Sequence, residues 1–383
     1  MHIVMDGANK CGVPDLFLYK YNNPPIPMSS MSIKKLLVMR FSAMGDVAMT
    51  VPVLNALATQ NPHLRITMLT RHRFVPMFEW LPSNVVVRGV DLSKYDGIMG
   101  ITRLFRELKE YDFDAVADLH DVLRTKYLRA CFRMAGTRIA VIDKGRKEKR
   151  ELTGCGQTHA PLKKMTERYV EVFKQLDLAC DLSDTTAIDT KHEDFSLVNN
   201  IMGTKLEGQK WIGVAPFAAH EQKVYPLYKM HEVINLLADK GYKLALFGAG
   251  DKEKSILAQW EAEYTPVGRE GEPGAIICTC GKLGGLRNEM LLMSKLDLMI
   301  SMDSANMHLA SIFNTPVLSI WGATHPKAGF TGFGQREDSI LQLDLPCRPC
   351  SVYGNKPCAY GDMRCMNISS ADVVAKAEEM IRS

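Results

Sequence analysis

The loop at residues 42–46, Ser-Ala-Met-Gly-Asp, directly follows the short apolar run 34–40. Gly45 permits a close turn, and Asp46 falls at or near the start of the next predicted helix. An aspartate at that position commonly caps the helix, which is the favoured interpretation of this loop taken alone. The alternative is a carboxylate that faces a cleft and accepts a proton as a general base.

A second group of polar residues occupies 301–308, Ser-Met-Asp-Ser-Ala-Asn-Met-His, after a predicted strand at 296–301. The segment opens a helix, and backbone N–H groups at a helix start bind phosphate well. Ser304 adds a hydroxyl donor, and His308 lies about one turn into the helix. The alternative is an ordinary cap followed by a histidine on the helix surface.

Two further loops of the second half carry candidate donor-binding groups. Lys223 precedes a predicted helix, where an ammonium group can reach a diphosphate, although most loop lysines do not. The glycine-rich turn 248–250 permits close ligand approach or simply reverses the chain. Glu253 follows it and can accept hydrogen bonds from a ribose.

The elements that position these groups alternate between short apolar runs and amphipathic stretches. Such alternation predicts an α/β protein with mostly parallel sheets. We expect a flexible extension at 1–32, a Rossmann-like acceptor domain at 33–190, a Rossmann-like donor domain at 208–368 and a terminal helix at 369–383, with the polar stretch 177–207 containing the linker. Two such domains would enclose a cleft between the carboxyl ends of their sheets.

Composition is that of a globular protein: 383 residues, 46% apolar, 23% charged and a net charge of +4. No apolar run spans a bilayer, and the first 32 residues lack the apolar core of a signal peptide, so a cytoplasmic protein is expected. The modest charge does not indicate a nucleic-acid partner. Basic residues cluster at 138–150, which is either a solvated loop or a landing site for an anionic partner.

Over nearly its whole length, 35–382, the chain resembles the ADP-heptose:lipopolysaccharide heptosyltransferases, glycosyltransferase family 9. The resemblance rests on residues 40–47 with Pro52, on 303–310, and on Pro316 with 322–326. It implies a GT-B arrangement and an inverting transfer of a heptose or similar sugar. The expected donor is a nucleotide-diphosphate sugar, ADP-linked, and the expected acceptor is the lipopolysaccharide core or a related anionic glycolipid. The enzyme would then work peripherally at the inner face of the inner membrane, without a required cofactor.

The resemblance also assigns roles to single residues. Asp46 corresponds to the general base, and Arg124 and Arg146 would face the acceptor. The donor-binding residues would be Lys223, Glu253, Asp303, Ser304, Ala305, Asn306 and His308. Ala305 stands where relatives often have glycine, and 218–219 is Ala-Ala where they often carry hydroxyls.

Four of the ten cysteines, Cys347, Cys350, Cys358 and Cys365, have spacings compatible with a tetrahedral metal site. Structural zinc is one interpretation, and reduced thiols packing a small subdomain is the other. Two disulfides are disfavoured in a reducing cytoplasm.

Three other functions compete with the transferase. A nucleotide-sugar epimerase with the same fold would convert the donor alone, without a glycolipid. A non-catalytic nucleotide-sugar binding protein is disfavoured by the joint presence of Asp46, Lys223 and His308. A Rossmann oxidoreductase is the least expected because the first loop lacks G-x-G-x-x-G.

Overall fold

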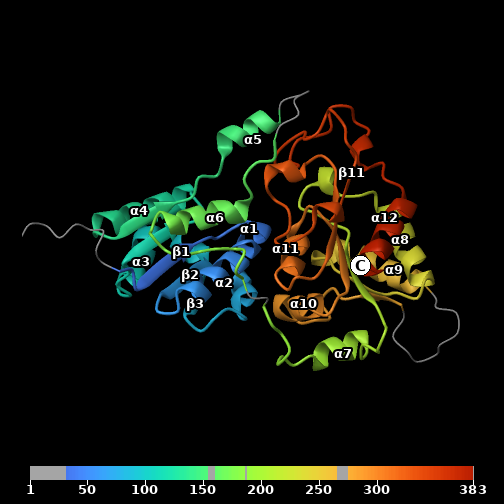
Figure 1. Cartoon of the computed structure of the whole chain (residues 1–383), viewed down its shortest axis with the longest axis horizontal. Helices are drawn as coiled ribbons and strands as arrows, with labels where there is room; N and C mark the ends of the chain where they lie inside the picture. Colours follow the sequence, from blue (N-terminus) through green and yellow to red (C-terminus); the bar gives the residue numbers. More distant parts are fainter. Residues whose placement is uncertain (1–31, 154–159, 186–187, 265–274, 383) are drawn as a thin grey trace, which may run out of the picture. The chain divides into compact units, whose positions relative to one another are not determined.

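The computed structural model describes residues 32–153, 160–185, 188–264 and 275–382. Residues 1–33 separate from 34–383 as a distinct unit, and the description here concerns the larger one. The predicted extension therefore lies, except for its last residue, outside the described part. The α/β class is confirmed: 34–383 contains two sheets whose strand pairs are all parallel (Figure 1).

The first sheet has the order β3-β2-β1-β4-β5. Its strands are β1 (Lys35–Met39), β2 (Arg65–Arg71), β3 (Val85–Val90), β4 (Ala115–Asp118) and β5 (Arg138–Val141). Because β1 has sequence-distant β4 on one side and β2 on the other, the strand order reverses there. Ligands of open α/β sheets bind beyond the carboxyl ends of the strands at such a point.

The second sheet has the order β11-β10-β9-β6-β7-β8 and reverses between β6 and β9. Its strands are β6 (Trp211–Ala215), β7 (Lys243–Leu246), β8 (Ile276–Cys278), β9 (Leu298–Met302), β10 (Val317–Trp321) and β11 (Ile340–Gln342). Every residue of β6, β7, β9 and β10 is buried, as expected for parallel strands covered by helices on both faces.

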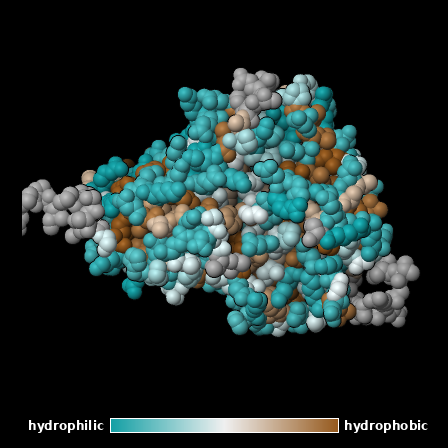
Figure 2. All heavy atoms as spheres, in the orientation of Figure 1, coloured by the Kyte–Doolittle hydropathy of each residue, from teal (hydrophilic) through white to brown (hydrophobic). Residues whose placement is uncertain are grey.

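The helices lie between these strands along the chain. The described α-helices are α1 (Met44–Ala48), α2 (Thr50–Gln60), α3 (Gly97–Lys109), α4 (Leu123–Met134), α5 (Arg146–Leu152), α6 (Met165–Lys174), α7 (Ser196–Met202), α8 (Leu227–Asp239), α9 (Gly250–Glu263), α10 (Leu286–Met293), α11 (Ala305–Ser311) and α12 (Ser370–Arg382). None of the helices in this part of the chain is long and apolar enough to cross a bilayer. Hydrophilic residues predominate on the face drawn in Figure 2, with apolar residues in separate patches.

Each sheet has its own apolar core. In the first half, Leu37 and Val116 pack with Leu104 of α3 and Leu128 of α4. In the second half the core includes Ile300 and Leu318 of the sheet together with residues of α8, α9 and α12. The terminal helix is therefore not a separate element, because Val373, Val374 and Ala377 bury its apolar face in this core.

Three predicted elements differ from the structure. The single helix predicted after the loop 42–46 is two helices, α1 and α2. Pro52 lies in the first turn of α2, where no intrahelical N–H bond is lost. The basic stretch contains the short helix α5, whose Leu152 is buried. The expected linker contains the helix α7, whose apolar side chains Val198 and Met202 are buried.

Candidate active site

A cavity of about 760 Å³ lies between the loops that follow β1 and β4 in the first half and those that follow β6, β7 and β9 in the second. All eight residues predicted as general base or donor contacts line it: Asp46, Lys223, Glu253, Asp303, Ser304, Ala305, Asn306 and His308. The two segments that the sequence singled out thus meet at one site, where the strand orders of both sheets reverse.

Helix α1 of the first half lies directly against α11 of the second half (Figure 1). Gly45 makes this approach possible, because a Cβ atom there would lie only 2.8 Å from Cδ2 of His308. The carboxylate of the first half and the helix start of the second therefore face a shared space.

Asp46 is fixed by two contacts within the first half. Its carboxylate forms an ion pair with Arg40 at 2.6 Å and accepts a hydrogen bond from the backbone N–H of Ala43 at 3.2 Å. Arg40 is buried and donates to the carbonyl of Leu119 at 2.6 Å, which holds the guanidinium in place. Asp46 is not the N-cap of α1, which is Ala43; it is the third residue of the helix, accepts the N–H of that cap, and lines the cavity with 23% of its side chain exposed.

The donor end of the cavity is built around Lys223 and Asp303. The ammonium group of Lys223 lies 2.8 Å from the carboxylate of Asp303 and donates to its carbonyl at 3.2 Å. Thr324 donates a further hydrogen bond to the same carboxylate at 2.8 Å. Asp303 therefore orients the lysine beside the start of α11, where backbone N–H groups at Ala305 and Asn306 are free of i−4 partners by their position in the helix.

His308 is fully enclosed where the two halves meet. Burial lowers its pKa to about 4, so the imidazole is neutral near pH 7. Its Nδ1 atom is buried without a hydrogen-bond partner among the described atoms. A neutral imidazole at this point can accept or donate one hydrogen bond to a bound sugar but adds no charge.

Two further carboxylates of the second half line the cavity. Glu253, near the start of α9, accepts a hydrogen bond from the backbone N–H of Ala249 at 2.7 Å. Glu289 of α10 also lines the cavity, and burial raises the pKa of its carboxyl group. Sequence analysis missed Glu289 because α10 follows no recognisable motif.

Several first-half residues that the predictions omitted also line the cavity, among them His120, Lys144 and Lys149. Burial, together with the charges of Arg40 and Lys144, lowers the pKa of His120 to about 3. Its Nε2 atom lies 3.2 Å from the hydroxyl of Ser42. The sequence could have indicated His120 as a site residue, because it directly follows β4. That strand pairs with β1 at the point where the strand order reverses.

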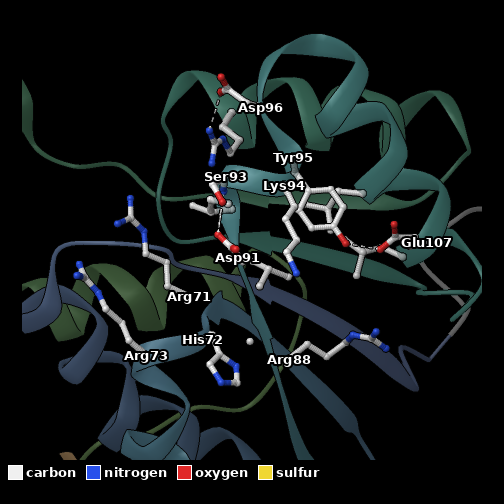
Figure 3. A pocket seen from close by; sticks show the side chains of 16 residues that line it. Arg71, His72, Arg73, Arg88, Asp91, Ser93, Lys94, Tyr95, Asp96 and Glu107 are labelled. Carbon is white, nitrogen blue, oxygen red and sulfur yellow. Dashed lines mark hydrogen bonds and ion pairs between the residues drawn. The ribbon is translucent and has the colours of Figure 1, made fainter.

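The two residues predicted to face the acceptor do not line this cavity. Arg124 lines a second pocket, of about 970 Å³, and forms an ion pair with Asp96 at 3.5 Å. Figure 3 shows the side chains of this second pocket, with Arg71, Arg73 and Arg88 on one side of it. Arg146, on α5, forms an ion pair with Asp121 at 2.9 Å. Their acceptor role stays a prediction.

The four cysteines of the carboxyl-terminal part form no disulfide. In the described ranges no three or more His, Cys, Asp or Glu side chains are arranged to hold a metal ion. Cys365 is buried in the core of the second half, and the thiol of Cys350 contacts the carbonyl of Cys347 at 3.5 Å. The zinc interpretation of these four cysteines stays a prediction.

The family model described as glycosyltransferase family 9 (heptosyltransferase) matches residues 101–360. The chain is 23% identical to lipopolysaccharide heptosyltransferase 1 of Pseudomonas aeruginosa over 85% of its own length and 88% of that protein's. It is 24% identical to lipopolysaccharide heptosyltransferase 3 of Escherichia coli, over 73% and 80% of the two chains. Among solved structures, the E. coli ADP-heptose lipopolysaccharide heptosyltransferase II superposes with a TM-score of 0.66 at 19% identity, covering 91% of this chain and 98% of that one.

These comparisons confirm the GT-B fold and favour a transferase over the epimerase alternative.

Proposed function

Because this chain belongs to glycosyltransferase family 9, the heptosyltransferases, we propose that it transfers a heptose from ADP-heptose to the lipopolysaccharide core, with inversion at the anomeric carbon. The observation that supports this proposal is the convergence of Asp46 with the Lys223–Asp303 pair and the start of α11 on one cavity. The four groups come from opposite halves of the chain.

Asp46 is the general base of the proposed reaction. Its carboxylate takes the proton of an acceptor hydroxyl while the hydroxyl oxygen attacks the anomeric carbon of the donor. The bond between that carbon and the diphosphate oxygen breaks on the opposite face, so a single displacement inverts the carbon. The ion pair with Arg40 and the N–H of Ala43 keep the carboxylate oriented toward the cavity.

The second half stabilises the leaving nucleoside diphosphate. Negative charge grows on the phosphate oxygen as the bond breaks, and a preorganised cation and helix start at that position lower the barrier. Lys223 supplies the cation, already oriented by Asp303. The backbone N–H groups at Ala305 and Asn306 supply the helix start, and Glu253 lies where a ribose hydroxyl can donate to it.

The acceptor is an anionic glycolipid that approaches from the first half. Its phosphate or carboxylate groups would bind in the pocket of Figure 3, where Arg71, Arg73 and Arg124 contribute positive charge. Arg146 would contact the same acceptor nearer the reaction. A glycolipid substrate and this basic surface together support peripheral association of the enzyme with the inner face of the inner membrane.

The test is the variant Asp46→Asn, which keeps the shape of the side chain and removes the base. Positioned base catalysis contributes roughly 10²- to 10⁴-fold, so kcat should fall by that factor. The dissociation constant for ADP, measured by calorimetry, should change little because Asp46 does not contact the donor phosphates. Asp114→Asn is the matched control, since that carboxylate accepts backbone hydrogen bonds at Lys34 and Lys35 away from the cavity.

A wild-type enzyme that fails to glycosylate deacylated heptose-free lipopolysaccharide with ADP-heptose would refute the substrate assignment. An Asp46→Asn variant that loses ADP affinity and turnover in equal measure would show that Asp46 acts only by stabilising the start of α1.

A further inference from the structure

The segment 345–364, here called the Cys-rich loop, has no part in the chemistry described so far. It contains Cys347, Cys350 and Cys358 and is anchored to the segment that follows β10. Arg348 donates to the carbonyls of Leu343 at 2.5 Å and Thr324 at 2.8 Å, and the N–H of Cys350 donates to the carbonyl of Ala323 at 2.8 Å. Since Thr324 also holds Asp303, the loop is built onto the donor end of the cavity.

Beyond these anchors the loop enters the cavity itself. Val352 and Tyr353 line it, and Gly354 lies against the methylene chain of Lys223. A Cβ atom at Gly354 would lie 2.7 Å from Cγ of Lys223, and the residue has a φ of +74°, so only glycine fits at this contact. The tight contact fixes the position of the neighbouring Tyr353.

Tyr353 lies next to a second aromatic residue and a buried lysine. Its ring centroid is 5.9 Å from that of Phe330, at an interplanar angle of 55°. The ammonium group of Lys149, from α5 of the first half, lies 4.4 Å from the centroid of Phe330. Lys149 is only 4% exposed, and in the part of the chain that the structure describes its ammonium group forms no ion pair with a carboxylate.

This wall faces the first half rather than the donor phosphates. Burial raises the pKa of Tyr353, and the charged groups that also act on it are Asp46, Arg40 and Arg146. All three belong to the first half, where the acceptor is expected. The Tyr353 side chain remains 53% exposed, so its ring is open to a ligand.

We propose that Tyr353 and Phe330 form a stacking platform for the terminal sugar ring of the acceptor and that Lys149 binds the acid group of that sugar. Aromatic rings pack against the C–H faces of sugars, and an ammonium group without a carboxylate partner attracts an anion. This assigns a place in the site to one acid group of the anionic acceptor proposed above. The Cys-rich loop is then a specificity element of the site, which rests on the proposed transferase function.

The experiment measures binding of deacylated heptose-free lipopolysaccharide by calorimetry to wild type and to Tyr353→Leu, Tyr353→Phe and Lys149→Met. We expect Tyr353→Leu and Lys149→Met to weaken the acceptor's affinity about tenfold, which corresponds to about 1.4 kcal/mol. Tyr353→Phe keeps the ring and should remain within threefold of wild type. ADP affinity should stay unchanged in all three.

Tyr360→Leu is the matched control. Tyr360 is on the same loop, is 61% exposed, and contacts Arg364 rather than the cavity. Wild-type acceptor affinity in Tyr353→Leu, or an equal loss in Tyr360→Leu, would overturn the platform. Acceptor affinity is measured without turnover, so the two proposals can fail separately. A wild-type enzyme that binds the acceptor but does not use ADP-heptose would refute the proposed donor. The platform would then still be judged by the Tyr353 variants.

Discussion

Replacing Gly45 with alanine tests whether the two halves cooperate in catalysis as the structure places them. The added methyl group would lie 2.8 Å from Cδ2 of His308. Ordinary van der Waals contact begins near 3.4 Å, so α1 and α11 must separate by at least about 0.6 Å or the imidazole must turn. Asp46, the next residue, moves with α1.

Misplacement of a reacting group by about 1 Å can lower a rate about 100-fold. We therefore expect Gly45→Ala to lower kcat roughly 10- to 100-fold. The ADP dissociation constant should change less than threefold, because Lys223 and the start of α11 stay together in the second half. The assay is single-turnover transfer from ADP-heptose, with ADP affinity measured separately by calorimetry.

The double variant Gly45→Ala/His308→Ala removes the clash and serves as a control for other effects of the methyl group. Its rate should not fall below that of His308→Ala alone. A Gly45→Ala enzyme with wild-type kcat would refute the reasoning, because the transfer step would then occur in an arrangement in which α1 and α11 are not in contact.

Three further outcomes are expected. Lys223→Met should weaken ADP binding about 10- to 100-fold, as loss of a charge-assisted contact does, and an unchanged ADP titration would contradict the donor assignment. Arg124→Ala should weaken acceptor binding and leave ADP affinity unchanged, because Arg124 lines the second pocket. An equal loss of both affinities would refute a role of Arg124 in acceptor binding alone. Lys149→Met should raise the unfolding temperature at pH 7, since burial lowers the pKa of Lys149 from 10.5 to about 8 and keeping the charge costs the native state about 3 kcal/mol. That gain should shrink by about half at pH 9.5, where the native lysine has lost its proton and the unfolded one keeps it; a pH-independent gain would refute the assigned cause.

Much of the fold was predictable from local pattern. The strands Ala115–Asp118, Trp211–Ala215 and Val317–Trp321 have the bounds that their apolar runs predict. Most residues of a buried parallel strand are apolar, so its ends are visible in the sequence, although β4 ends at the buried Asp118. Short elements without such a run, such as β8 and α10, were missed.

The sequence alone also determined the eight residues that line the cavity, because each follows a strand at the carboxyl edge of a sheet, where binding groups of this fold gather. That signal is local: it needs only a strand, a loop and a polar side chain close together in the chain. Arg124 and Arg146 have no such local signal. They were assigned by resemblance to the family, and neither lines the cavity.

Only the tertiary structure decided which distant segments complete the site. Tyr353 and Lys149 follow no pattern that points to Asp46, yet packing of the two halves brings them to the same cavity. The arrangement of the four cysteines also depends on the tertiary structure, because their spacing permits a metal site but does not fix how far apart the thiols lie. Periodicity records which side of an element is buried but not what lies against it, so contacts between elements far apart in the chain emerge only on folding.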